Sequence, residues 1–414
     1  MKIAVIGAGI VGICTAYELA QDGHTVCVFE SNAAIAEDAS FACAGHISPS
    51  MAHSLAWPEW PHSSRLRALL GASGIALGRS TTLGDLRWLS GWKTATREFF
   101  ERFASAHALV NLGQARLQAL TAQSGLVFEQ SQGQLLLLRS ERETLAYQER
   151  LTALRGLGVT ALVLTPEQAR AVEPALGTDI PMHGAIHFPN DSVANCRQFA
   201  HALKDQAMAM GVVFHFNTPV KTISQSPGVQ IQTERLGAQA FEQVVLCAGT
   251  GASALLGMGR KAAPLTPLWS YSLSAQVREP LNAPRSAVLD KHSGISISRM
   301  GARLRVAGAA ELGGRRNLPH KGSSENLYRA LQAYFPGAAD FGRSIQFWKG
   351  ASVFSADALP LLGPSVRSGV WLNLAHGHNG WGMACGAARV LADQIGGRSA
   401  ELDTTRMHPS RFKL

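Results

Sequence analysis

The first thirty residues combine two apolar runs with a glycine-rich turn. The run from Ile3 to Ile6 leads into the turn, a helical pattern follows, and a second run from Thr25 to Phe29 ends in Glu30. This order predicts a strand–helix–strand unit of the dinucleotide-binding type, in which the turn faces a pyrophosphate and the acidic side chain accepts hydrogen bonds from a ribose. The candidate phosphate-binding residues are Gly7, Ala8, Gly9, Ile10, Val11 and Gly12.

Two later stretches repeat this kind of pattern. The apolar run 243–247 predicts a buried parallel strand, and it ends in a second glycine turn at Ala248 and Gly249, where another segment could cross the cofactor. Residues 370–374 predict a further strand, followed by a glycine-rich turn and a helix that ends at Gly396. We therefore expect a parallel sheet assembled from distant parts of the chain.

The segments between these stretches show other periods. From about Trp57 to Leu120 the spacing is helical and rich in aromatic residues, which we interpret as core and lid packing rather than a platform for stacking bases. Residues 184–188 predict a strand that closes at Pro189. An antiparallel sheet is predicted by the alternation of residues 268–277, 295–299 and 303–307.

These patterns predict two interleaved domains, for which 414 residues are long enough. We expect residues 398–414 to be a solvated extension. The nucleotide-binding domain is expected to comprise residues 1–60, 190–262 and 350–414, and the second domain residues 61–189 and 263–349.

Composition narrows the class of protein only a little. Hydrophobic residues make up 46% and charged residues 16% of the chain, as in ordinary globular proteins, and no further apolar stretch predicts a membrane-spanning helix. The formal charge of +9 suits an anionic cofactor, an acidic substrate, an anionic lipid surface or a nucleic acid. Because the basic residues are dispersed, we expect a net-positive solvated surface, no nucleic-acid partner, and at most peripheral contact with the inner face of a membrane.

The six cysteines show no C-x-x-C pair and no spacing typical of zinc. Several lie within apolar patterns, as small core residues do. We therefore expect no metal site and a reducing, cytoplasmic location.

Several linked motifs together resemble one family, the FAD-dependent D-amino-acid oxidase superfamily, and within it most of all the bacterial D-amino-acid dehydrogenases. The resemblance implies a glutathione-reductase-type FAD-binding Rossmann domain interleaved with an α+β substrate domain built on an antiparallel sheet. It also implies non-covalent FAD. The motifs that carry it are the glycine turn, Ala44-Gly45-His46-Ile47-Ser48-Pro49, Phe188-Pro189-Asn190-Asp191, Phe214-His215-Phe216-Asn217-Thr218-Pro219-Val220 and Gly377-His378-Asn379-Gly380-Trp381-Gly382-Met383-Ala384-Cys385-Gly386.

The resemblance also places residues along the cofactor. Glu30 would hold the adenosine ribose with Ser31 nearby, and Val220 would contact the adenine side through its backbone. Ser40 would lie near the pyrophosphate. The isoalloxazine would lie near Ala44, Gly45, His46 and Ile47, with its pyrimidine edge facing the helix start at Gly377, Asn379, Gly380, Trp381, Gly382 and Met383.

The reaction implied is hydride transfer from the carbon that bears an amine to flavin N5, followed by hydrolysis of the imine. Such chemistry needs orientation and a neutral amine more than a strong base. The resemblance also implies that electrons pass on to a quinone or an electron-carrier protein. Candidate residues around the substrate are His46, Tyr271, Ser352, His378 and Asn379, with His376 as a further acid–base candidate and sheet packing as the other interpretation of Tyr271.

One departure from the family pattern bears on the substrate. Ser352 stands where many members carry an arginine that clamps the substrate carboxylate through two hydrogen bonds. Cys43 likewise replaces an asparagine near the ring. Either another cation binds the carboxylate, or the substrate is not a simple free amino acid. The candidate cations are Arg299, Arg303, Arg305 and Lys349.

Two other functions are left open by the sequence. The superfamily contains flavin oxidoreductases that act on a modified nucleoside in RNA, which the positive charge permits. The missing arginine also fits a non-catalytic flavoprotein, or the flavin-binding subunit of a heteromeric dehydrogenase.

Overall fold

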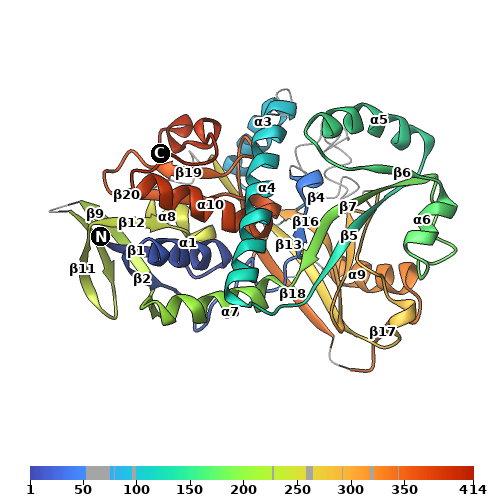
Figure 1. Ribbon diagram of the computed structural model, residues 1–414, viewed down its shortest axis with the longest axis horizontal. Helices are drawn as coiled ribbons and strands as arrows, with labels where there is room; N and C mark the ends of the chain where they lie inside the picture. Colours follow the sequence, from blue (N-terminus) through green and yellow to red (C-terminus); the bar gives the residue numbers. More distant parts are fainter. Residues whose placement is uncertain are drawn as a thin grey trace.

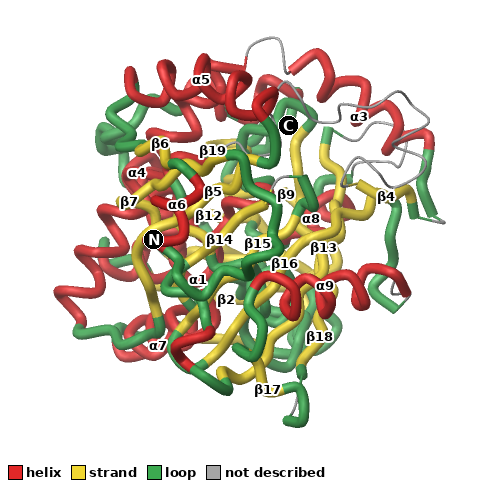
Figure 2. The backbone as a smooth tube through the Cα atoms, turned by 90° about the vertical axis from the view of Figure 1, so that its right-hand side faces the viewer, coloured by secondary structure: helices red, strands yellow, loops and turns green. Residues whose placement is uncertain are grey.

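The computed structural model describes residues 1–52, 75–78, 80–95, 99–225, 228–257, 264–290, 292–317, 321–343 and 345–414. In this part of the chain, two large sheets lie side by side with helix α4 (Phe99–Ser124) running between them (Figure 1). Both chain ends lie on the side of the first sheet. Seen from the side, the strands occupy the centre, and α4, α5 (Glu141–Gly156) and α7 (Cys196–Ala209) lie around them (Figure 2).

The first sheet is built around β1 (Lys2–Ile6), in which every residue after the exposed Lys2 is buried. β1 pairs in parallel with its neighbours on both sides, and an antiparallel strand closes one edge. Helices α1 (Ile10–Gln21), α7 and α10 (Gly380–Ile395) pack against one another beside this sheet. The strand order is β19 (Leu361–Pro364), β20 (Val370–Leu374), β12 (Gln243–Leu246), β1, β2 (Thr25–Phe29) and β8 (Val213–His215).

The second sheet is mainly antiparallel, and α9 (Lys321–Tyr334) packs on it. Its main path runs through β17 (Ala339–Asp340), β13 (Leu265–Val277), β16 (Arg303–Leu312), β15 (Ile295–Met300), β14 (Ala287–Asp290), β5 (Gln130–Leu138), β7 (Gly184–Ala194) and β3 (His46–Ile47). Three further strands pair beside this path, namely β18 (Gln346–Ser355), β4 (Ile75–Leu77) and β6 (Leu162–Leu164).

The remaining elements are smaller. A three-stranded sheet of β9 (Val220–Gln225), β10 (Val229–Thr233) and β11 (Gly237–Phe241) lies beside the first sheet, with α8 (Ala252–Leu255) near it. Helices α3 (Leu83–Ala95) and α6 (Pro166–Val172) complete the described part. None of the helices described combines the length and apolar character needed to cross a bilayer.

The predicted fold class, a Rossmann-type sheet interleaved with an α+β part, is confirmed. Strand β2 has the predicted bounds, and so does β20. The local patterns suffice here because glycine turns and polar residues bound each apolar run. The final helix begins at Gly380, within the stretch predicted as a glycine-rich turn.

Two of the predicted boundaries are wrong. Strand β7 does not close at Pro189 but continues to Ala194. The pairing with β5 has a bulge at this point, so no hydrogen bond is needed from position 189, where proline has no N–H. The C-terminal segment is not a solvated extension either. Met407 is fully buried, and Arg411 Nε lies 2.7 Å from Asp357 Oδ2. The segment is therefore packed against the body of the protein.

The aromatic helical segment is described only in part, because Trp57 and Trp60 lie outside the described residues. Trp88 on α3 is buried, and its ring centroid lies 6.4 Å from that of Phe354. Phe103 on α4 is buried as well. These two residues support the interpretation of this segment as core packing.

Candidate flavin and substrate site

The glycine turn between β1 and α1 has the close contacts that its sequence predicts. Gly7 has a φ of +104°, and a Cβ there would lie 2.6 Å from the Cys247 carbonyl oxygen. A Cβ on Gly12 would collide with the Gly7 carbonyl. Beside Gly9, by contrast, the nearest atom to a built Cβ is Ser40 Oγ at 3.5 Å. The backbone is therefore packed on the sheet side and open at Gly9, as an approaching pyrophosphate requires.

The start of α1 carries no side-chain cap from Gly9, and the Ile10 N–H donates to Ser40 Oγ at 3.0 Å. Ala8 is buried and Val11 half-buried. The second glycine turn lies next to the first, because the Cβ built at Gly7 would be 3.1 Å from the Ala248 Cα, and Gly249 follows with a φ of +50°. The helix N-terminus thus offers partial positive charge to an anion.

Glu30 lies at the carboxyl end of β2 and is only 6% exposed. Its Oε2 accepts from the Ala8 N–H at 2.6 Å, and its Oε1 accepts from Asn32 and from the Ser31 hydroxyl. These bonds fix the carboxylate next to the glycine turn. The Thr218 N–H donates to the Glu30 carbonyl, which brings the start of β9 at Val220 to the same end of the site.

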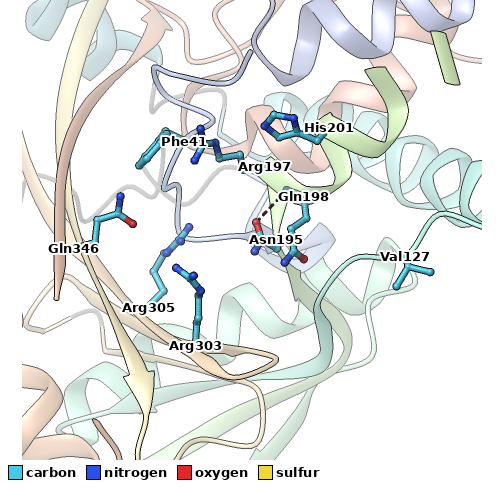
Figure 3. A pocket seen from close by; sticks show the side chains of 9 residues that line it. All are labelled: Phe41, Val127, Asn195, Arg197, Gln198, His201, Arg303, Arg305 and Gln346. Carbon is cyan, nitrogen blue, oxygen red and sulfur yellow. Dashed lines mark hydrogen bonds between the residues drawn. The ribbon is translucent and has the colours of Figure 1, made fainter. Parts of the chain in front are cut away.

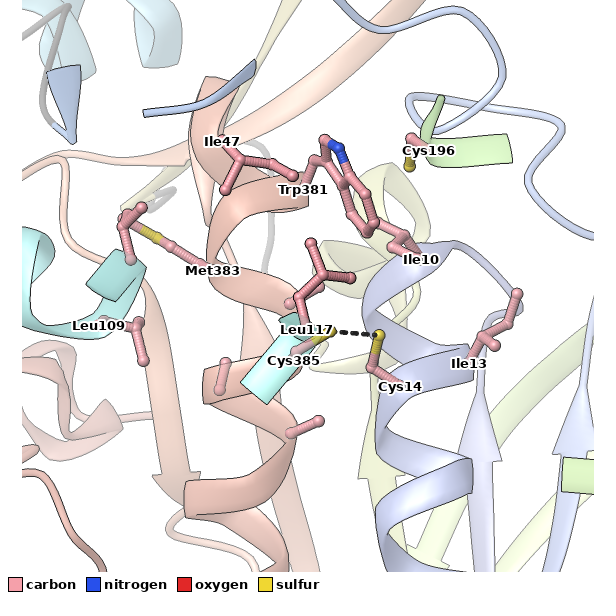
Figure 4. Close-up of a cluster of buried hydrophobic side chains, with 14 of the residues drawn as sticks. Ile10, Ile13, Cys14, Ile47, Leu109, Leu117, Cys196, Trp381, Met383 and Cys385 are labelled. Carbon is pink, nitrogen blue, oxygen red and sulfur yellow. Dashed lines mark hydrogen bonds between the residues drawn. The ribbon is translucent and has the colours of Figure 1, made fainter. Parts of the chain in front are cut away.

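The segment expected at the flavin ring joins the second sheet to α10. His46 and Ile47 form β3, which pairs with β7, and the Ala194 N–H donates to the Gly45 carbonyl. A Cβ on Gly382 would lie 3.5 Å from the Ile47 Cα, so the first turn of α10 packs directly on this segment. Figure 4 shows Ile10, Ile47, Trp381 and Met383 in one buried cluster. The starts of α1 and α10 are therefore brought together.

The turn before α10 is held by Asn379. Its Nδ2 donates to the carbonyls of Met51 at 2.9 Å and Ala52 at 2.6 Å. Because this side chain points away from the helix, the first turn of α10 has no side-chain cap. Gly377, just before it, packs against the Phe354 ring. Asn379 thus holds the turn in place by hydrogen bonds, and no side chain caps the positively polarised start of the helix.

Two histidines lie close enough to influence each other. His46 Nε2 is 2.6 Å from Ser296 Oγ, and burial lowers the pKa of His46 to about 4. The surrounding protein also lowers the pKa of His378 to about 4, with repulsion from His46 as a second cause. His378 is exposed, so solvent limits this effect on it. Both imidazoles are neutral at pH 7. Burial likewise lowers the pKa of His376 to about 4.

Tyr271 is not brought together with these histidines. Its hydroxyl donates to Glu311 Oε2 at 2.6 Å, and its ring packs in the cluster that contains Leu327 and Leu331 of α9. The next residue, Ser272, points the other way and donates to the Ala42 carbonyl. The sheet therefore separates Tyr271 from the flavin segment, which favours the packing role.

Among the described residues, none of the four candidate cations occupies the position where the missing arginine would lie. Lys349 is bound to Glu311 at 2.7 Å and shares the Tyr271 face, whereas Ser352, three residues along β18, points to the other face. Arg305 pairs across from Ser274, six residues along β13 from the Leu268 that pairs with Ser352, or about 20 Å away. Arg299 donates to backbone carbonyls, and Arg303 lies two residues from Arg305 on the same face.

A row of serines on the second sheet supports the flavin segment, and the sequence analysis missed it. Ser272 and Ser298 donate to the carbonyls of Ala42 and Ala44, and Ser296 contacts His46. Ser296 and Ser298 are two residues apart on β15, and Ser272 on β13 is in register with Ser296 through Ala307 of β16, so all three lie on one face of the sheet. Small hydroxyls at every second position of a buried strand were the available signal.

The described residues fit FAD. Several buried polar atoms have no hydrogen-bond partner among them, and two of these, His46 Nδ1 and Trp381 Nε1, belong to residues expected at the isoalloxazine. Buried polar atoms normally find hydrogen-bond partners, so these two point to a missing group. The open side of Gly9 and the uncapped α10 match the phosphate and ring ends of the same cofactor.

The comparisons with known proteins agree with this geometry. Residues 2–394 match the family model DAO, described as FAD dependent oxidoreductase. Over the full length of both chains, the chain is 32% identical to a D-amino acid dehydrogenase of Rhizobium rhizogenes, and it is 31% identical to one of Bradyrhizobium diazoefficiens, of which it covers 99%.

Among solved structures, glycine oxidase from Geobacillus kaustophilus is similar in fold, with a TM-score of 0.77, 22% identity, and 99% of this chain and 98% of that chain covered. L-proline dehydrogenase from P. horikoshii follows with a TM-score of 0.73, 18% identity, and coverage of 100% and 97%. The chain belongs to the DAO family of FAD-dependent oxidoreductases.

Proposed function

We propose that this chain oxidises the C–N bond of an amino acid or related amine, and that water then hydrolyses the imine to a carbonyl compound and ammonia. When bound, FAD supplies the acceptor for the hydride. The observation that carries the proposal is the junction of β3, the serine row and α10, which places His46, Ser296 and the α10 N-terminus around one point. The curated relatives named D-amino acid dehydrogenase support it.

The residues of this site act by position and charge. The uncapped start of α10 would stabilise negative charge on the bound flavin. Asn379 holds that helix start in place. His46, oriented by Ser296 and neutral at pH 7, offers a hydrogen bond without adding a positive charge beside the amine. The amine can then bind in the neutral form that hydride loss requires.

The substrate we propose is an amine or amino acid derivative whose recognition does not depend on a clamped carboxylate. This follows from Ser352 and from the distant or engaged positions of the four candidate cations. Small D-amino acids would then be poor substrates. A panel of D- and L-amino acids, N-methyl and cyclic imino acids and simple amines, scored by anaerobic bleaching of the flavin absorbance, tests both the reaction and the substrate.

The finer features of the enzyme are also proposals. The FAD is non-covalent, because the segment 350–354 carries no cysteine and Cys385 is buried in α10, 3.7 Å from Cys14. The electron acceptor is a quinone or carrier protein, in line with the dehydrogenase names of the curated relatives. The free thiols fit a cytoplasmic setting, and the charge of +9 allows peripheral contact with an anionic membrane.

A further inference from the structure

A cavity of about 590 Å³ lies between α7 and the second sheet, and two of the candidate cations, Arg303 and Arg305, line it. The start of α7 forms one wall, and the strands β16 and β18 form the other (Figure 3). The volume is in the range of small-molecule sites. Its polar lining consists chiefly of three arginines, Arg197, Arg303 and Arg305, and three amides, Asn195, Gln198 and Gln346.

The charge of Arg305 is not balanced by direct contact with an acid. Arg305 is only 8% exposed. Its guanidinium donates to two neutral acceptors, the Ser274 hydroxyl at 3.1 Å and the Cys43 carbonyl at 2.9 Å. Burial is the main reason that the pKa of the Arg305 guanidinium is lowered. Repulsion from Arg303 acts in the same direction, whereas attraction to Cys43, Cys196 and Glu129 opposes it. Two guanidinium groups are thus held close together on one face of β16.

Arg197 faces them from α7. Its guanidinium carbon lies 4.2 Å from the centre of the Phe41 ring, and its Nε is buried with no hydrogen-bond partner among the described residues. Glu37 Oε1 is 3.6 Å from Arg197 Nη2, and Glu129 accepts from Asn195 Nδ2 at 3.0 Å. Neither carboxylate lines the cavity. The lining therefore has an excess of positive charge and of unused N–H donors.

We propose that this cavity binds a small organic acid or phosphate ester through its oxyanion group. Planar guanidinium forks match carboxylate and phosphate oxygens, and the amide side chains can bind the rest of the ligand. A bound oxyanion would relieve the repulsion between Arg303 and Arg305, and it would lie near the N-terminus of the 14-residue helix α7. The volume leaves room for an organic body beyond the charged group.

The cavity is separate from the position of Ser352, but it borders the serine row, because Arg305 pairs with Ser298. Gln346 and Ser352 lie on the same strand but six residues apart, or about 20 Å. Phe41 nevertheless belongs to the segment that leads to Ala44, and Arg305 holds the Cys43 carbonyl of the same segment. A ligand in the cavity is therefore expected to shift the flavin absorbance slightly.

Calorimetric titration of the FAD-loaded enzyme at constant ionic strength tests the proposal, with inorganic phosphate and succinate as probes. We expect saturable binding of at least one probe, and a loss of about tenfold in affinity in Arg303→Gln and in Arg197→Gln. The matched control is Arg299→Gln, which removes an equal charge outside the cavity and should bind normally. Tighter binding of phosphate identifies a phosphate ester, and tighter binding of succinate an organic acid.

Three results would overturn the proposal. One is the absence of saturable heat with both probes at millimolar concentrations. Another is an equal loss of affinity in Arg299→Gln, which would mean a diffuse charge effect. The third is a fall in FAD content in Arg303→Gln and Arg197→Gln, with thermal stability retained, because the cavity would then serve the cofactor's own phosphates.

Discussion

His46 Nε2 lies 2.6 Å from Ser296 Oγ, so a residue of the second sheet fixes the orientation of the His46 imidazole. Ser298 and Ser272 support the backbone of the same segment from the same face. The second sheet therefore fixes the segment 42–46, which is expected to lie at the flavin ring.

Removing this contact should slow the reaction without removing the cofactor. In Ser296→Ala the imidazole loses its partner, and we expect the rate of anaerobic flavin reduction to fall about tenfold, the equivalent of roughly 1.4 kcal/mol for a buried hydrogen bond. Stopped-flow absorbance measures the rate. Ser224→Ala, on the exposed strand β9, serves as the control, and an unchanged rate in Ser296→Ala would refute the orienting role.

Asn379 should matter for stability as well as for the cofactor. Asn379→Ala leaves the Met51 and Ala52 carbonyls without their donor, and we expect a loss of about 1–3 kcal/mol in the free energy of unfolding together with weaker FAD binding. Urea unfolding and fluorescence titration of FAD measure the two effects. Asn190→Ala, whose amide makes one exposed bond to Thr160, should change neither.

Glu30 should contribute to FAD affinity through its charge. In Glu30→Gln the Oε1 that accepts from Asn32 and Ser31 is retained, whereas the anionic acceptor beside the Ala8 N–H is lost. We expect the dissociation constant of FAD to rise about tenfold, as for the loss of a charge-assisted hydrogen bond. Glu234→Gln, which removes an exposed carboxylate, should bind FAD as the wild type does.

The contribution of His46 and His376 to stability should fall as the pH is lowered from 6.5 towards 4. His46 and His376 have pKa values lowered to about 4 in the folded state, against about 6.5 for an exposed imidazole. The unfolded chain therefore binds more protons between these pH values, so the stability gained from burying the neutral rings is present above pH 6.5 and is lost as the pH falls.

Each of these two histidines contributes a slope of up to about 1.4 kcal/mol per pH unit in this window. Thermal unfolding at intervals of pH measures it, and His376→Asn should flatten the curve. A curve of equal slope in His376→Asn and wild type would show that His376 is not buried as a neutral ring.

Much of the nucleotide-binding half could be predicted because its signals are local. The runs 3–6, 25–29 and 370–374 are bounded by glycines and polar residues, and each became a strand. The path of β7 beyond Pro189 could not be predicted in this way, because it depends on the bulge in its partner β5. Similarly, the burial of Met407 depends on contacts with distant residues, which no local pattern contains.

The candidate site shows the same division. The residues of the glycine turn and the α10 start follow from motifs with a fixed backbone geometry. The alternation of β13 predicts that Tyr271 and Ser272 lie on opposite faces of the sheet, but it does not tell which face is turned to the segment 42–46. The register of β13 with its neighbours decides this. For the same reason, the role of the serine row could not be predicted, because its contacts with the segment 42–46 form only in the folded sheet.

The most direct test of the account is anaerobic bleaching of the FAD-loaded wild type and of Ser352→Arg by D-alanine and by amines that lack a free carboxylate. We expect the wild type to be bleached slowly by D-alanine and faster by at least one of the amines. Ser352→Arg should shift this preference towards D-alanine by restoring a carboxylate clamp. Rapid, saturable bleaching of the wild type by D-alanine, with none of the amines faster, would contradict the account.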